Sequence, residues 1–74
     1  MEMGERIREA RMAKGMTMEE LGEKLGVSHA AVSRWESNDR KPRLEHLFRL
    51  SLLLDVEVNY LIGLRKNPDQ IVPQ

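Results

Sequence analysis

The 74-residue chain contains no cysteine and only one residue each of tryptophan, tyrosine and phenylalanine. Without cysteine the chain can form neither a disulfide framework nor a thiolate metal site, which suits a reducing cytoplasm. It also lacks any apolar run near the ~18 residues that a membrane-spanning helix requires. These absences, together with the length, favour one small domain with a modest core.

The chain has no excess of charge, because twelve Lys and Arg residues balance twelve Asp and Glu residues. A net charge of zero, taken alone, disfavours a nucleic-acid partner. The charges are nevertheless unevenly distributed: residues 28–43 carry four basic and two acidic side chains, whereas residues 44–64 carry three acidic and one basic. We therefore expect a neutral molecule with one basic end.

Apolar residues recur at helical spacing through the first third of the chain. Met3, Ile7 and Ala10 share one face of a first helix, which Gly15 ends. Thr17 then has the position of an N-cap, and its spacing to Glu20 predicts a capping box. A second helix follows, with an apolar stripe of Met18, Leu21 and Leu25 and with Gly26 closing it in a left-handed conformation.

A third helix begins after Ser28, only two residues beyond Gly26. So short a connection forces the two helices to meet at a steep angle, which is typical of a helix-turn-helix. Gly22 lies inside the second helix, where glycine is unfavourable, and we interpret it as allowing the neighbouring helix to approach closely. On the third helix Val32 and Trp35 share the inner face, and the outer face carries small and polar residues: His29, Ala30, Ser33 and Arg34.

Pro42 precedes a strongly apolar fourth helix, where its missing N–H is harmless. Because mostly apolar positions cover much of the cylinder, we expect this helix to be central; the positions are Leu44, Leu47, Phe48, Leu50, Ser51 and Leu54. Asp55 ends it, and a short fifth helix closes near Gly63. The sequence thus predicts an all-α domain of five helices over residues 1–64, followed by a flexible tail or linker over residues 65–74.

An ordered set of residues at these spacings resembles the phage-repressor and Cro type of helix-turn-helix, also called the XRE family. The resemblance covers residues 3–64 and is carried by Gly4-Glu5-Arg6-Ile7-Arg8, Arg11, Gly15, Thr17, Glu20-Leu21, Leu25-Gly26-Val27-Ser28, Val32-Ser33, Trp35-Glu36, Pro42 and Leu54-Asp55-Val56. It implies a five-helix phage-repressor-like fold, with the helix-turn-helix formed by the second and third helices. It also implies a sequence-specific regulator of transcription, most simply a repressor, that reads the major groove as a dimer on a two-fold symmetric operator.

Carried over by position, the resemblance makes residues 18–25 the positioning helix and residues 29–36 the recognition helix. Base contacts then fall to His29, Ala30 and Arg34, with Ser33 beside them. It also implies a buried ion pair between Arg11 and Glu36. The chain departs from the family at two positions: Met18 replaces a glutamine that contacts phosphate, and Gly22 replaces an alanine.

The residue chemistry fits such a surface. Ala30 and Ser33 are small enough for the helix backbone to approach DNA, and Arg34 can donate two parallel hydrogen bonds to guanine. Phosphate contact by Arg34, or a merely solvated charge, remains open, as does a merely solvated His29. The expected contacts to the DNA backbone come from the basic loop and two helix caps: Thr17, Ser28, Asn38, Arg40, Lys41 and Arg43.

Partners and alternatives follow from the remaining residues. We expect a homodimer, at least on DNA, with Val58, Ile62 and Leu64 as its surface unless they complete the core. The alternative class is a protein-interaction module, such as the antitoxin of a toxin–antitoxin pair, with a partner reaching the C-terminal tail. No thiol, triad or metal-ligand spacing is present, so we expect no enzyme, cofactor or metal. A bacterial or phage-encoded protein of the cytoplasm, associated with the nucleoid, fits these expectations.

Overall fold

The computed structural model describes residues 1–64, and the predicted tail over residues 65–74 lies outside this described part. Within residues 1–64 the chain forms five helices and no strand, which confirms the all-α class. The helices are α1 (Met3–Ala13), α2 (Met18–Leu25), α3 (His29–Glu36), α4 (Leu44–Leu54) and α5 (Val58–Leu61). None of them is long and apolar enough to cross a membrane.

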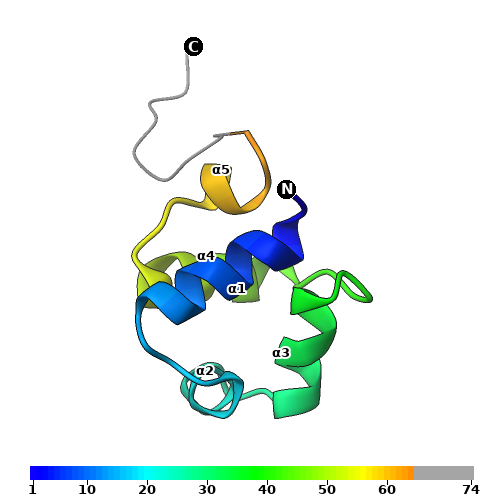
Figure 1. Ribbon diagram of the computed structural model, residues 1–74, viewed down its shortest axis with the longest axis vertical. Coiled ribbons are helices and arrows are strands. Elements are labelled where there is room, and N and C mark those ends of the chain that lie inside the picture. Colours follow the sequence, from blue (N-terminus) through cyan, green and yellow to red (C-terminus); the bar gives the residue numbers. More distant parts are fainter. Residues whose placement is uncertain (65–74) are drawn as a thin grey trace.

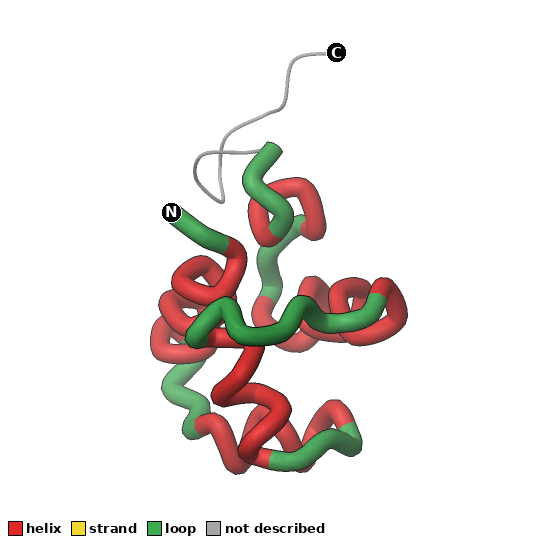
Figure 2. Tube along the Cα trace, turned by 90° about the vertical axis from the view of Figure 1, so that its right-hand side faces the viewer, coloured by secondary structure: helices red, strands yellow, loops and turns green. Residues whose placement is uncertain are grey.

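Helix α1 is the centre of the arrangement. It packs against α3, α4 and α5, while α2 and α3 pack against each other at one end of the molecule. In Figure 1 α1 crosses in front of α4, with α5 above them and the α2–α3 pair below. Figure 2 shows the long loop after α3 running over the surface of the helical body. Within the α2–α3 pair, α1 therefore supports α3 and α4 supports α2.

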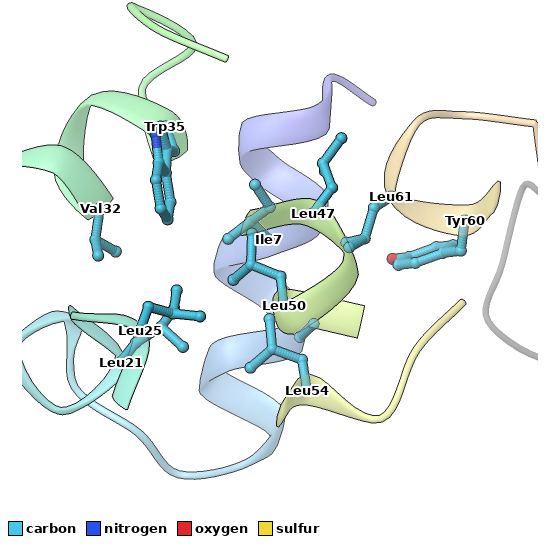
Figure 3. Close-up of a cluster of buried hydrophobic side chains, with 11 residues drawn as sticks. Ile7, Leu21, Leu25, Val32, Trp35, Leu47, Leu50, Leu54, Tyr60 and Leu61 are labelled. Atoms are coloured by element: carbon cyan, nitrogen blue, oxygen red, sulfur yellow. The ribbon is translucent and has the colours of Figure 1, made fainter. Parts of the chain in front are cut away.

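One apolar cluster joins all five helices (Figure 3). Ile7, Leu21, Val32, Leu50 and Leu61, one from each helix, have no exposed surface. The predicted inner face of the third helix is confirmed, because Trp35 is buried beside Val32. The remaining buried apolar members are Ala10, Leu25, Leu47, Leu54 and Tyr60.

The predicted helix boundaries around the turn are confirmed. Thr17 and Glu20 form a reciprocal capping box, with N···O distances of 2.9 and 3.1 Å. Gly26 closes α2 with a positive φ of 74°. The Ser28 hydroxyl accepts a hydrogen bond from the amide of Ala31 at 3.1 Å. Each of these features depends on a few adjacent residues, so sequence spacing was enough to predict it.

Gly22 is required for close packing, as expected, but its near neighbour is the turn rather than the body of α3. A Cβ atom on Gly22 would lie 2.8 Å from the carbonyl oxygen of Val27, closer than real Cβ contacts allow. Gly4 is in tighter surroundings still, because a Cβ there would collide with the backbone carbonyls of Trp35 and Glu36. Glycine at these two positions brings α1 and α2 onto the two ends of α3.

The expectation that the fourth helix is central on most of its surface is wrong. Leu47, Leu50 and Leu54 are buried, and Ser51 is half-buried, but Leu44 and Phe48 are exposed. The reason is geometric: α1, α2 and α5 contact α4 and together cover only part of its circumference. An apolar ridge therefore remains uncovered by any described residue.

Candidate nucleic-acid interface

The outer surface of α3 is open to solvent. His29, Ala30 and Arg34 are exposed, and Ser33 is half-buried. The opposite side of the same helix is buried in the core through Val32 and Trp35. Residues brought together by the 3.6-residue period therefore form one face of small and hydrogen-bonding side chains with a single long cation.

A bidentate ion pair between Arg11 of α1 and Glu36 of α3 joins these two helices. Arg11 Nε lies 2.6 Å from Glu36 Oε2, and Arg11 Nη2 donates to Glu36 Oε1 at 3.0 Å. Arg11 Nη1 also donates to the carbonyl of Met16 at 2.7 Å. Hydrogen bonding to Glu36 raises the pKa of the Arg11 guanidinium above its usual value. Because this geometry uses both carboxylate oxygens, it orients the end of α3 as well as holding it.

The ion pair also changes the charge balance at the surface. Glu36 is buried and neutralised by Arg11, so its charge no longer offsets the basic end of the molecule. The exposed charges within residues 28–43 are then four cations against one acid: Arg34, Arg40, Lys41 and Arg43 against Asp39. This local excess is larger than the sequence totals indicated.

The four cations surround one shallow hollow beside α3. Its volume is about 280 Å³, and its lining consists of Val27, Ala31, Arg34, Trp35, Arg40, Lys41, Arg43 and His46. The ring of His46 lies against that of Trp35, with 5.4 Å between the ring centroids. His46 is half-buried there. The hollow is thus a concave basic surface with a ring-lined side, suited to a negatively charged and partly apolar partner.

The loop after α3 is built onto the end of that helix. The amides of Asp39 and Arg40 both donate to the carbonyl of Arg34, at 2.9 and 3.2 Å. Asn38 has a positive φ of 66°, and its Oδ1 accepts the amide of Gly4 at 2.9 Å. The side-chain oxygen of Asn38 therefore has a structural partner, which leaves its Nδ2 as the donor for any external ligand.

The N-termini of α2 and α3 differ in charge. At α2 the Glu20 carboxylate accepts the amide of Thr17, and this hydrogen bond lowers the pKa of Glu20. A negative charge therefore already lies at the N-terminus of α2. Helix α3 has no acidic residue in its first turn and only the neutral hydroxyl of Ser28 as its cap. Of the two caps, Ser28 marks the N-terminus that is better suited to an anion.

Two side chains of α2, Glu19 and Met18, limit the DNA contacts that this surface can make. His29 Nε2 lies 3.6 Å from Glu19 Oε1, so a charged His29 has an acidic neighbour within its own protein. Met18 is half-buried and packs against the core cluster. It therefore contributes packing where the resemblance places a phosphate-binding glutamine.

Sequence reasoning missed Arg49 as a positioning residue. Its guanidinium donates to the carbonyls of Leu25 and Lys24, at 3.0 and 2.8 Å, and so satisfies the C-terminus of α2 from α4. The contact joins residues more than twenty positions apart, and no local spacing signals it. It holds the turn between α2 and α3 at a fixed distance from α4.

The residues expected at the dimer surface lie at the α5 end of the molecule, where Ile62 lines a second hollow together with Arg40 and Lys41 of the basic loop. Val58 is half-buried, and Ile62 and Leu64 are exposed. None of the three belongs to the core cluster. They remain available at the α5 end of the molecule.

Comparison with known proteins identifies the family to which the chain belongs. The sequence model of the helix-turn-helix family matches residues 7–61, and the chain belongs to that family. The uncharacterized HTH-type transcriptional regulator YobD of Bacillus subtilis is 40% identical over 65 residues, covering 88% of this chain and 58% of its own length. The chain thus spans little more than half of this relative.

Two relatives have solved structures with DNA. Repressor protein C2 of Salmonella phage P22 is 40% identical over 60 residues, covering 81% of this chain and 28% of its own. The P22 c2 repressor in complex with synthetic operator 9T superposes with a TM-score of 0.81, at 38% identity, over 85% of this chain and 96% of that one. SinR, a master regulator for biofilm formation, in complex with DNA, gives 0.73 at 38% identity, over 80% and 95%.

Proposed function

We propose that this protein is a sequence-specific, double-stranded DNA-binding regulator of transcription, acting as a repressor in the cytoplasm. The observation that carries the proposal is the exposed face of α3 beside a hollow surrounded by four cations. The likeness to the P22 c2 repressor bound to an operator supports it.

The direct readout is assigned to α3. Arg34 donates two parallel hydrogen bonds to guanine O6 and N7, a contact worth roughly 1–3 kcal/mol of discrimination against other bases. Ala30 and Ser33 keep the helix axis close to the base edges, and Ala30 contacts a thymine methyl. His29 donates from the first turn, in competition with its Glu19 neighbour.

The contacts to the DNA backbone are assigned to the basic loop and the helix caps. Arg40, Lys41 and Arg43 bind phosphates and fix the register of α3 without reading sequence. The amides behind Ser28 add a phosphate site at the N-terminus of α3. Thr17 and Asn38 make the weaker contributions. The Glu20 carboxylate already accepts the Thr17 amide, and the Asn38 Oδ1 already accepts the Gly4 amide.

A single domain of this size offers few base contacts, so the protein binds DNA as a dimer. Two copies related by a two-fold axis read half-sites about 10 base pairs apart. The apolar residues Val58, Ile62 and Leu64 are assigned to the contact between copies on DNA.

The test is selection of bound duplexes from a random library at low salt, followed by affinity measurements on the enriched site. We expect a two-fold symmetric site, and we expect Arg34→Ala to lose about tenfold or more in affinity for it. Lys14→Ala is the matched control, because Lys14 lies beside Asp55 at the opposite end of α1 from the basic loop.

If no duplex is enriched, the DNA-binding proposal fails, and the polar face of α3 is a surface for a protein partner. If a duplex is enriched but Arg34→Ala binds it with wild-type affinity, the protein binds DNA and Arg34 does not contact a base.

A further inference from the structure

A hollow of about 430 Å³ lies between the C-terminal parts of α1 and α4, with α5 completing it. Within residues 1–64 its lining shares no residue with that of the basic hollow beside α3. Its walls are apolar and consist of Ala10, Ala13, Leu54 and Val56. Its volume falls in the range of roughly 300–1,000 Å³ that is usual for small-molecule sites. We call it the α1–α4 hollow.

Tyr60 contributes a buried hydroxyl to this hollow. It is the only polar residue of the described lining that is buried, with 5% of its surface exposed. Figure 3 shows its phenol pointing from α5 into the apolar cluster, with the oxygen at the inner end. Arg6 donates to its backbone carbonyl and lies over its ring, but within residues 1–64 the hydroxyl itself has no hydrogen-bond partner. Because buried polar groups in folded proteins are nearly always hydrogen-bonded, this hydroxyl indicates a partner from outside the chain.

The rim of the hollow is negative in character. Helices α1 and α4 end side by side there (Figure 1), and their capping residues approach each other, with Lys14 Nζ 3.7 Å from Asp55 Oδ2. A helix C-terminus carries a partial negative charge, and α4 has no basic residue in its last turn to offset it. The exposed Glu9 adds a second carboxylate beside the single ammonium of Lys14. Two carboxylates and two helix C-termini therefore favour a cationic ligand over an anionic one.

We propose that the α1–α4 hollow binds a small amine with an apolar body. The ammonium lies at the rim near Glu9 and Asp55, and the body packs against the apolar walls. A hydroxyl or carbonyl at the far end of the ligand pairs with the Tyr60 hydroxyl. The site is separate from the surface assigned to DNA and does not rest on the proposed function.

Tyramine is the probe for this site, because it carries an ammonium, one aromatic ring and a hydroxyl at the opposite end. In an NMR titration of the ¹⁵N-labelled protein without DNA, we expect saturable shifts of the backbone amides of Ala13, Asp55 and Tyr60. The amides of Arg34 and Lys41 should not move. The compound para-hydroxyphenylpropionate, which has a carboxylate in place of the amine, should bind at least about tenfold more weakly, because like charges meet at the rim.

Two variants separate the parts of the site. Tyr60→Phe keeps the ring over Arg6 and removes only the hydroxyl, so it should lower the affinity for tyramine about fivefold and leave that for phenethylamine, which lacks the hydroxyl, unchanged. Asp55→Asn should weaken the binding of both amines, and asparagine tolerates the left-handed backbone at this position, where φ is 57°. Asp39→Asn, in the basic loop, is the matched control and should bind both as the wild type does. Thermal melting confirms that the variants remain folded.

Three results would overturn the proposal. One is the absence of shifts around the hollow up to ~10 mM tyramine, a limit well above a millimolar dissociation constant. Another is equal binding of the amine and the carboxylate, which would remove the preference for a cation. The third is wild-type affinity of Tyr60→Phe for tyramine, which would show that the hydroxyl does not contact the ligand. None of these results bears on DNA selection through α3, so failure here is distinguishable from failure of the proposed function.

Discussion

Two groups of arginines in this protein have opposite surroundings. Arg6 and Arg11 are buried: Arg6 donates to the carbonyl of Tyr60 and lies over the Tyr60 ring, and Arg11 forms the ion pair with Glu36. Arg34, Arg40 and Arg43 are exposed around the basic hollow, and Lys41 belongs to the same exposed group. The comparison teaches that the net charge of zero hides the binding surface, because part of the acid and base content balances inside the fold.

The two groups should therefore be separable by experiment. Substitution in the buried group is expected to change stability, and DNA binding only through stability. Substitution in the exposed group is expected to change affinity and salt dependence, with the fold intact.

The largest effect is expected from Glu36→Gln, which leaves the Arg11 guanidinium buried without its ionic partner. Loss of one partner of a buried pair costs about 3–5 kcal/mol, comparable with the whole stability of a domain of this size. We expect the variant to be largely unfolded at 25 °C in urea titrations followed by circular dichroism. Asp39→Asn, an exposed acid three residues later, is the control and should unfold within ~0.5 kcal/mol of the wild type. A Glu36→Gln protein as stable as the wild type would show that the fold does not depend on the Arg11–Glu36 ion pair.

A smaller effect, on affinity alone, is expected from Lys41→Ala in the exposed group. Loss of one phosphate contact should lower the magnitude of the logarithmic salt slope by about 0.9. Binding to the selected duplex, measured by fluorescence anisotropy between 50 and 200 mM salt (roughly the range in which such slopes are resolved), checks this value. The thermal midpoint should not move. An unchanged salt slope would show that Lys41 does not contact a DNA phosphate.

The smallest effect concerns the acid at the N-terminus of α2. The lowered pKa of Glu20 means that its carboxylate form stabilises the fold. This contribution is fully present above the unfolded value near 4.5 and is lost as the pH falls through the lower pKa of the folded state. Glu20→Gln should therefore melt slightly below the wild type at pH 7, and the difference should vanish at the acidic end of a pH series. A difference that persists in acid would show that the charge is not responsible.

The parts of the fold that depend on neighbouring residues could be predicted from the sequence. The capping box at Thr17, the left-handed Gly26 and the Ser28 cap each require only a few adjacent positions. The exposed side of α3 followed from helical periodicity once Val32 and Trp35 were placed inside. Pairing of Arg11 with Glu36 required the resemblance, because no local pattern links residues 25 positions apart.

The rest depends on tertiary contacts that no spacing encodes. Gly4 matters because the end of α3 passes over it, and Arg49 matters because α2 ends beside it. The apolar content of α4 predicted burial but could not show which arc its neighbours would cover. Phe48 was therefore placed wrongly in the core. The roles of the predicted contact residues on α3 and its loop stay predictions until DNA is added.

The central claim is that the exposed basic group, and not the α4–α5 side, binds DNA. It is tested most directly by a two-dimensional NMR titration of the ¹⁵N-labelled protein with the selected duplex. The largest shifts should fall on backbone amides of Ser28, Arg34 and Lys41, with Lys14 and Asp55 unchanged at the far end of α1. Shifts confined to α4 and α5, with residues 28–43 unmoved, would contradict the account.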